Sequence, residues 1–343
     1  MANNYGVGVI GAGHSLPSQI ETNEDLCKSL EGISPEWITE KTGITKRYIA
    51  SNKDTASGFA ISASKKAIKM AGIDSKKVGL IIGCTFSHDY QFPPLSAKVQ
   101  KELKASNAQV FDIQANCAGF LTGLTVATDR MLIDSTIEYA LVIGVELQSR
   151  FTERKNVETA IFLSDGAGAA VLGRVPKGQG IIASSFHADT SAYELVRLRG
   201  GGSSYPGIGR KITPEIDYME MNGLATWKQA ITNLPISVRR VCNKAHIPIE
   251  EIDLFLFHQA NLNLIYYVLK KLKINGEKTY TNVERIGNTG SASLPIVLSE
   301  AIQKNIVKEK QYVLMTAVGA GFIYGSSIWK WNEIKFTGKN YEK

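Results

Sequence analysis

Cys117 is the residue whose surroundings in this sequence most suggest chemistry. It stands in "DIQANCAGFLTG" (112–123), between an expected strand and an expected helix that is rich in small residues. The thiolate is the reactive form of cysteine, and the partial positive charge at a helix N-terminus lowers a thiol pKa. The stretch therefore predicts either a nucleophile at the start of a helix or a small buried side chain that fills the core.

Two further residues could take part in the same chemistry. His258 ends the apolar run "IDLFLFH" (252–258), and Asn288 lies in "RIGNTGSASLP". Alternatively, His258 is an ordinary hydrogen-bonded histidine at the end of a strand, and Asn288 is part of a simple turn. The glycine-rich stretch "AVGAGFIYG" (317–325) brings backbone N–H groups together, as in an oxyanion hole or a tight strand turn.

The elements that must position these residues alternate between strand and helix, which predicts an α/β fold. Strands are expected at 78–84, 108–113, 139–145, 252–258, 279–283 and 312–318. Helices are expected at 55–72, 94–105, 118–132, 263–272 and 293–305. Gly72 closes the first helix, and Pro94 opens the second.

The two halves of the chain repeat the same order with similar spacing. Gly83 precedes Cys117 by 34 residues, and His258 precedes Asn288 by 30. We therefore expect two duplicated α/β halves, 1–173 and 174–343. Sites in parallel sheets form beyond the carboxyl ends of the strands, so a pseudo-twofold pairing of the halves could bring Cys117, His258 and Asn288 together.

The segment 174–250 departs from this repeat. It contains a glycine-rich, loop-like insert at 198–217 and a helical stretch at 224–245. Pro235 lies inside that stretch, which predicts a kink or two shorter helices.

Composition and short motifs argue against several classes of protein, namely nucleic-acid-binding, membrane-spanning, zinc-binding and dinucleotide-binding proteins. The chain has 343 residues and a net charge of +7, from 39 basic and 32 acidic residues, which favours an acidic partner. It has no basic run interleaved with aromatics, so nucleic acid is the weaker choice. No uncharged apolar stretch is long enough to span a membrane, and the four widely spaced cysteines fit no zinc pattern, so no metal and a cytoplasmic location are expected. "GVIGAGHS" (8–15) does not fit the dinucleotide-binding pattern, which argues against a Rossmann oxidoreductase.

Several motifs in register carry a family resemblance. "DIQANCAGFLTGL", "IFLSDGAGAAVLG", "IDLFLFHQANLNLI", "RIGNTGSASLP" and "GAGFIYGSS" resemble those of β-ketoacyl-acyl-carrier-protein synthase III, a condensing enzyme of the thiolase fold. The resemblance runs from about residue 5 to 330. It implies decarboxylative condensation of an acyl group, held on Cys117, with a malonyl group on acyl carrier protein. His258 and Asn288 would stabilise the enolate, and the backbone N–H groups of Cys117 and Ala320 would form the oxyanion hole.

The resemblance also implies a substrate entrance. Coenzyme A or phosphopantetheine thioesters would be substrates, with no cofactor. Residues expected to bind the coenzyme A or pantetheine arm are Trp37, Lys41, Trp227 and Asn261. The acidic carrier protein would dock at Lys228, Lys270 and Lys271, and the enzyme would be a homodimer with Phe92 near the partner and the acyl pocket.

Three positions depart from the family pattern. Lys41 replaces an Arg near the adenine, Val157 stands where an Arg usually meets the coenzyme, and Asn263 replaces an Arg of carrier docking. With a glycine-rich loop at 199–212, they point to a specialised paralogue that takes an unusual acyl-CoA or an acyl-carrier primer. The alternatives are an acyltransferase that forms an ester or amide without decarboxylation, and a partner subunit of a condensing enzyme.

Overall fold

The computed structural model describes residues 4–334, which build two large β-sheets and two small sheets of two strands each. The first has the order β1–β7–β6–β4–β5, with strands Tyr5–Ser15, Asp165–Pro176, Tyr139–Leu147, Val78–Cys84 and Gln109–Ile113. The second has the order β8–β13–β12–β11, with strands Gly180–Ala188, Ile323–Lys330, Tyr312–Gly319 and Leu254–Phe257.

The two sheets repeat one pattern of strand pairing. In each, one parallel pair (β4 with β6, β11 with β12) is followed by two antiparallel pairs. The first sheet adds β5, parallel to β4, whereas at the same edge of the second only Thr279 bridges to Phe255. The strand expected at 279–283 is therefore wrong: the N–H groups of Asn282 and Val283 bond to the Gln259 side chain instead of a neighbouring strand.

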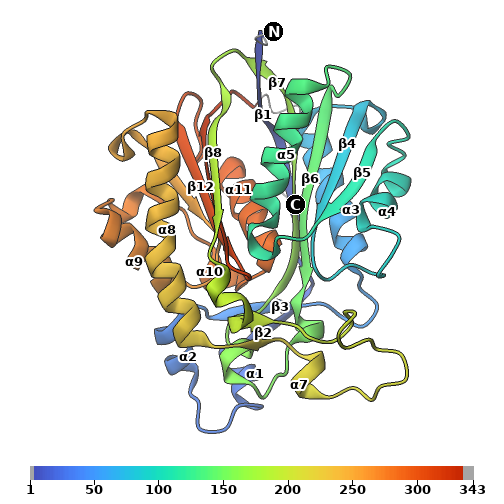
Figure 1. Ribbon diagram of the computed structural model, residues 1–343, viewed down its shortest axis with the longest axis vertical. Helices are drawn as coiled ribbons and strands as arrows, with labels where there is room; N and C mark the ends of the chain where they lie inside the picture. Colours follow the sequence, from blue (N-terminus) through green and yellow to red (C-terminus); the bar gives the residue numbers. More distant parts are fainter. Residues whose placement is uncertain (1–3, 335–343) are drawn as a thin grey trace.

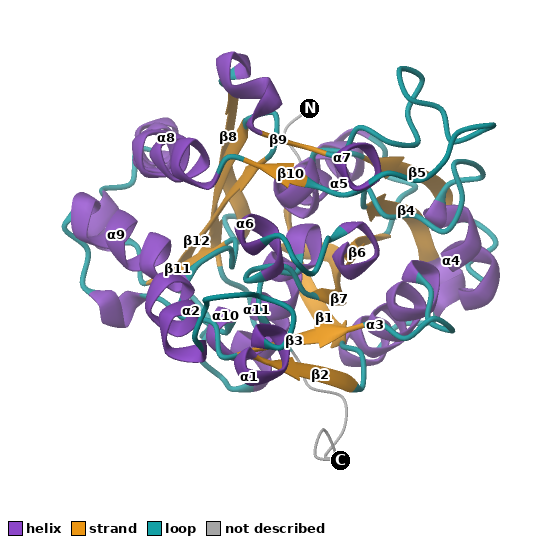
Figure 2. Cartoon of the chain, turned by 90° about the horizontal axis from the view of Figure 1, so that it is seen from below, coloured by secondary structure: helices purple, strands orange, loops and turns teal. Residues whose placement is uncertain are grey.

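Helices separate and cover the sheets, giving five layers (Figure 1). Helices α5 (Gly119–Ile133) and α11 (Ser293–Gln303) lie between the sheets, as the view in Figure 2 also shows. The first sheet is covered outside by α3 (Ala56–Ala71) and α4 (Leu95–Leu103), and the second by α8 (Gly223–Ala245) and α9 (Leu262–Leu272). This arrangement confirms the duplicated, thiolase-like α/β fold.

Capping and close packing explain why these elements form where the sequence places them. Thr55 caps the N-terminus of α3, and Gly72 ends it in the left-handed region at φ 67°. A Cβ at Gly11 or Gly13 would lie 2.4 or 2.5 Å from a backbone oxygen of α3, so these glycines let β1 pack tightly on the helix. "GVIGAGHS" is thus part of a strand, as its poor fit to a phosphate loop indicated.

Helix α8 contains Pro235 and yet runs as one helix over 23 residues. Of the two expected outcomes, a kink or two shorter helices, the division into two helices is therefore wrong. A proline has no N–H to bond the carbonyl four residues earlier, here that of Ile231. The Lys271 ammonium group, from α9, donates to that carbonyl at 3.0 Å. A side chain of the neighbouring helix therefore replaces the missing bond.

Smaller elements gather at one end of the sheets (Figure 1). They are β2 (Gln19–Thr22), α1 (Asn23–Cys27), α2 (Pro35–Thr42), β3 (Lys46–Ile49), α6 (Val157–Ala160), β9 (Val196–Arg197), α7 (Pro214–Asp217), β10 (Glu220–Met221) and α10 (Val283–Ile286). The insert at 198–217 connects β9 to β10, and ion pairs of Arg197 and Arg199 with Glu220 hold its base. None of the helices within 4–334 has the length and apolar character needed to cross a membrane.

Candidate active site

Cys117 lies in a short 3₁₀ turn (Asn116–Ala118) that joins β5 to α5. Asn116 adopts a positive φ of 49°, which Asn tolerates better than most residues, and its side chain donates to the Ala320 carbonyl at 2.9 Å. A Cβ at Gly319 would lie 2.4 Å from the Ala115 oxygen and 3.3 Å from the Cys117 nitrogen. The end of β12, within the glycine-rich stretch, therefore lies directly against the backbone of the cysteine turn.

His258 directly follows β11 and is buried. Its Nδ1 lies 2.5 Å from the Ser293 hydroxyl oxygen, which also accepts the Gln259 N–H at 3.2 Å. Among residues 4–334, Nδ1 is the one acceptor in reach of the Ser293 hydroxyl proton. Ser293 therefore donates to Nδ1, and the ring carries its own proton on Nε2.

Asn288 is held through its backbone and its side-chain oxygen. Its N–H donates to the Phe162 carbonyl, and its own carbonyl accepts the Ser164 N–H at 2.8 Å. The side-chain Oδ1 accepts the Gly290 N–H at 2.9 Å, which identifies the other terminal atom as the Nδ2 donor. That Nδ2 donates to no atom of the described chain.

One pocket brings these groups together from both halves of the chain. Cys117, His258 and Asn288 line it, with Ala320 and Trp227, around about 150 Å³ of open space. Most other lining side chains are apolar, as expected for a pocket that admits an acyl chain. Asn261, also on the wall, caps α9 by accepting two backbone N–H groups.

Burial sets the protonation of the site. It raises the pKa of the Cys117 thiol to about 12, and the Glu146 carboxylate nearby adds to the shift. The lowered thiol pKa expected from the helix N-terminus is therefore wrong, because desolvation of the thiolate outweighs it. Burial lowers the pKa of His258 to about 4, so its ring is neutral at pH 7. Burial also raises the pKa of Glu146 to about 8, against hydrogen bonds from Ser87 and Ser291.

The other residues predicted for binding are spread around the site. Trp37 and Lys41 lie on α2 and do not line the pocket, and the Lys41 ammonium is 5.9 Å from the Trp37 ring centroid. Lys228 is exposed on α8, and Lys270 and Lys271 lie in the last turn of α9.

Phe92 is 84% exposed and is not part of the pocket wall. Sequence reasoning missed four residues of the site: Gln148, Ser293, Met219 and Met221. Met219 directly precedes β10 and Met221 is its last residue, and neither belongs to a motif in the sequence. Ser293 did stand in "GNTGSASLP", five residues after Asn288, which places it at the start of the expected helix.

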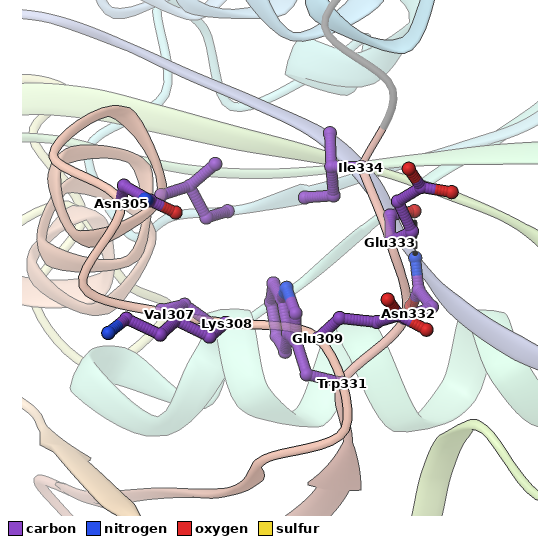
Figure 3. Close-up of a pocket in the computed structure, with 9 residues that line it drawn as sticks. Asn305, Val307, Lys308, Glu309, Trp331, Asn332, Glu333 and Ile334 are labelled. Carbon is purple, nitrogen blue, oxygen red and sulfur yellow. Dashed lines mark hydrogen bonds between the residues drawn. The ribbon is translucent and has the colours of Figure 1, made fainter.

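A second cavity, of about 190 Å³, lies between the end of α11 and the segment after β13 (Figure 3). Lys308, Glu309 and Trp331 are among its lining residues, and none of the predicted chemical residues is. Within 4–334, no three His, Cys, Asp or Glu side chains are grouped so that they could hold a metal ion.

Sequence comparison gives consistent matches along the chain. Residues 111–190 match the profile of 3-oxoacyl-[acyl-carrier-protein (ACP)] synthase III, and residues 242–331 match the profile of its C-terminal part. A β-ketoacyl-[acyl-carrier-protein] synthase III of Natranaerobius thermophilus is 37% identical over 94% of this chain and 98% of its own length. That of Caldanaerobacter subterraneus is 35% identical over 97% of this chain and its whole length.

Solved structures agree with the sequence matches. The 3-oxoacyl-[acyl-carrier-protein] synthase III of Aquifex aeolicus superposes with a TM-score of 0.87 at 34% identity, covering 95% of this chain and 100% of the other. The priming β-ketosynthase of the R1128 polyketide pathway reaches 0.89 at 26% identity, covering 97% and 98%.

Proposed function

The chain belongs to the β-ketoacyl-acyl-carrier-protein synthase III family, and we propose that Cys117, His258 and Asn288 carry out its condensation. The family makes the chain an acyltransferase of the condensing type, which acts in fatty acid or polyketide synthesis. The observation that supports the residue assignment is the single pocket where a thiol faces two hydrogen-bond donors.

The first step loads the enzyme. The Cys117 sulfur attacks the carbonyl of an acyl thioester, the bond to the donor sulfur breaks, and the Cys117 proton leaves on the departing thiol. One thiol replaces another, so the exchange requires no net acid or base. A neutral resting thiol, which its pKa of about 12 indicates, is compatible with this exchange.

The second step forms the carbon–carbon bond. The thioester oxygen of a malonyl group would accept hydrogen bonds from His258 Nε2–H and Asn288 Nδ2–H. These donors stabilise the enolate that forms when the carboxylate leaves as carbon dioxide. The enolate carbon then attacks the acyl carbon on Cys117, the bond from that carbon to the Cys117 sulfur breaks, and the released thiolate takes up a proton from solvent to restore the thiol. A neutral histidine suits this role because its Nε2 keeps its proton at pH 7.

The oxyanion of the attacked thioester would be bound by backbone N–H groups of Cys117 and Ala320. Neither N–H donates to a backbone oxygen in the part of the chain that the structure describes. The close approach of Gly319 to the cysteine turn supports their convergence. Loss of one such donor typically costs about 3 kcal/mol of barrier.

The residues expected at the substrate entrance support the proposal that the first acyl group comes from an unusual acyl donor. Val157 packs with Trp37 against the apolar cluster of Leu26, Leu30, Ile38, Ala160 and Ile161, so that side chain offers no charge to a coenzyme phosphate. Asn263 donates to the carbonyls of Glu40 and Lys41, which leaves its amide engaged with α2. We therefore propose an acyl group delivered by a carrier protein or an unusual acyl-CoA.

The carrier protein is acidic, and the net charge of +7 favours its approach. Lys228 and Lys270 are the proposed contacts. Lys271 already donates to the Ile231 carbonyl, so its proposed role in docking is secondary to its role in α8. Trp227 and Asn261 would line the path of the pantetheine arm, and Trp37 and Lys41 would lie at its outer end.

We propose a homodimer formed at strand β5. This strand pairs with β4 on one side and with no strand of the described chain on the other, and open edges favour pairing with another chain. Exposed Tyr90 and Phe92 lie in the loop just before α4, and Phe92 would reach the partner. We further propose that residues 1–173 and 174–343 form the two halves, and that the protein acts in the cytoplasm without a cofactor.

Intact-mass analysis tests the assignment of the nucleophile. The protein is incubated with a panel of acyl-CoA and acyl-carrier-protein donors, beside the Cys117→Ala variant. At least one donor should add its acyl mass to the wild type and none to the variant. Equal addition to both proteins, or none to either, would contradict the proposal. The reacting donor also identifies the primer and its carrier.

A further inference from the structure

The pocket wall contains two side chains with a polar atom that the condensation does not use and that has no partner within residues 4–334: the Thr226 hydroxyl and the side-chain oxygen of Gln148. The Gln148 oxygen can only accept a hydrogen bond, which makes it the more selective of the two. Gln148 begins the 3₁₀ turn after β6 and lines the pocket that contains Cys117. Its exposed fraction is 2%, so its amide is removed from bulk water. A polar group in such a place needs a partner to offset its lost hydration.

The orientation of this amide is fixed by its nitrogen. Nε2 donates to the Asn288 carbonyl at 2.6 Å and to the Ser164 carbonyl at 3.3 Å. Only the nitrogen can face two carbonyl oxygens, so the other terminal atom is Oε1. Within residues 4–334, Oε1 accepts no hydrogen bond.

A purely structural role accounts for the side-chain nitrogen of Gln148 but not for its side-chain oxygen. The nitrogen of Gln148 holds the Asn288 segment, although the Ser164 N–H already bonds the same Asn288 carbonyl at 2.8 Å. The oxygen contributes to neither contact. Leu163, Val196 and Met219 on the same pocket wall are apolar and offer it no donor. The Thr226 hydroxyl also lines the pocket, but it makes no hydrogen bond within residues 4–334.

We propose that Gln148 Oε1 selects an acyl group that carries a hydroxyl, in preference to a plain alkyl chain. The inference rests on the proposed function, because the group it recognises is the one that Cys117 receives. A hydroxyl donates one hydrogen bond and is neutral, so it enters an apolar pocket at little cost once bonded. A carboxylate has no proton to donate and would face the oxygen unfavourably. An alkyl chain leaves the oxygen unpaired, which is the larger penalty.

Competing pantetheine thioesters test this selectivity without assuming which carrier delivers the acyl group. Butyryl-pantetheine is compared with its 2-, 3- and 4-hydroxybutyryl counterparts, and the rate of Cys117 acylation is followed by intact mass. The wild type should load at least one hydroxyacyl donor about tenfold faster than butyryl. In Gln148→Met the ratio should fall to about one or below.

The ratio within one protein is the readout, so partial loss of activity in a variant does not affect it. Gln303→Met, at the exposed end of α11 and outside the pocket, should keep the wild-type ratio. Equal loading of all donors by the wild type, or an unchanged ratio in Gln148→Met, would overturn this inference alone. Absence of loading by any donor would overturn the proposed function, and this inference with it.

Discussion

The turn that carries Cys117 has a counterpart in the second half of the chain, and the two use their side chains differently. Each half has a 3₁₀ turn that leads into a central helix: Asn116–Ala118 into α5 and Gly290–Ala292 into α11. In the second turn, the Ser291 hydroxyl donates to the Cys84 carbonyl at 2.7 Å. Within 4–334 the Cys117 sulfur has no side-chain hydrogen-bond partner. The first turn thus leaves the Cys117 sulfur available for reaction. The second turn uses its side chain to hold the backbone of β4 at Cys84.

The close contacts of the two turns are reciprocal. A Cβ at Gly144, near the end of β6, would lie 2.3 Å from the Ser291 oxygen of the second turn. A Cβ at Gly319, at the end of β12, would lie 2.4 Å from the Ala115 oxygen beside the first turn. Each half therefore needs a glycine where it meets the other half's turn. In the proposed mechanism the two halves share this framework and differ in their chemistry: the first would hold the acyl group on Cys117, and the second would supply the donors of His258 and Asn288.

Replacing the nucleophile should have the largest effect. In Cys117→Ala, condensation should fall at least about 10³-fold, because no acyl-enzyme can form. The donors of the second half remain, so slow release of carbon dioxide from malonyl-carrier protein should persist. Product and carbon dioxide are measured separately, with Cys242→Ala, in the buried part of α8, as the matched cysteine control. Equal loss of condensation and of carbon dioxide release would contradict the proposal that the two halves carry separate steps.

Replacing the amide donor should have the next largest effect. Asn288→Asp keeps an oxygen for the Gly290 N–H but exchanges the Nδ2 donor for a second oxygen. Decarboxylation should fall by about 10²–10³-fold, since a donor is lost and a negative charge faces the enolate. Acylation of Cys117 should change by much less. If acylation falls as far as decarboxylation, the division of labour between the turns is wrong.

Removing the Ser293 hydroxyl should have a smaller effect, because it acts through His258. In Ser293→Ala the ring loses the bond that keeps its proton on Nε2, and we expect about a tenfold slower decarboxylation. Ser293→Thr, which retains a hydroxyl, should recover most of the rate. Cys117 acylation provides the comparison, and a parallel fall in acylation would indicate general damage to the pocket.

Lowering the pH should reduce the free energy of unfolding, because His258 is buried in its neutral form. Its pKa is about 4 in the folded protein and about 6.5 when unfolded, so the unfolded chain binds the proton more readily. The resulting stabilisation is complete above pH 6.5 and is lost as the pH falls toward 4. Between pH 7 and 5.5 the free energy of unfolding should fall by about 1 kcal/mol more in the wild type than in His258→Gln. Urea unfolding at both values measures this difference, and identical pH dependence would contradict a neutral buried ring.

Much of the fold follows from local sequence patterns. Strands and helices were predictable where apolar period, caps and glycines agree, as in α3 between Thr55 and Gly72. The strand expected at 279–283 failed because Gln259, far away in the sequence, bonds the backbone there. The division into two helices, which was one of the two outcomes expected at Pro235, did not occur, and Lys271 supplies the bond that the proline cannot make. Both errors arise from side chains of other elements.

The identity of the candidate catalytic residues was predictable from the sequence, but their protonation states were not. Cys117, His258 and Asn288 follow from motif and repeat, and they line one pocket. The pKa of the thiol depends on how far it is buried, which no local pattern gives. The contacts of Ser293 and Gln148 depend on where α11 begins and where β6 ends relative to the other half.

The most direct test of the account is a single turnover from preloaded enzyme. Wild-type protein is acylated with a reactive donor and freed of excess, and malonyl-carrier protein is then added. The account predicts that the acyl mass leaves Cys117 at the rate at which β-ketoacyl-carrier protein and carbon dioxide appear, and that His258→Ala retains its acyl group. Loss of the acyl mass to free acid or an ester without carbon dioxide would contradict it.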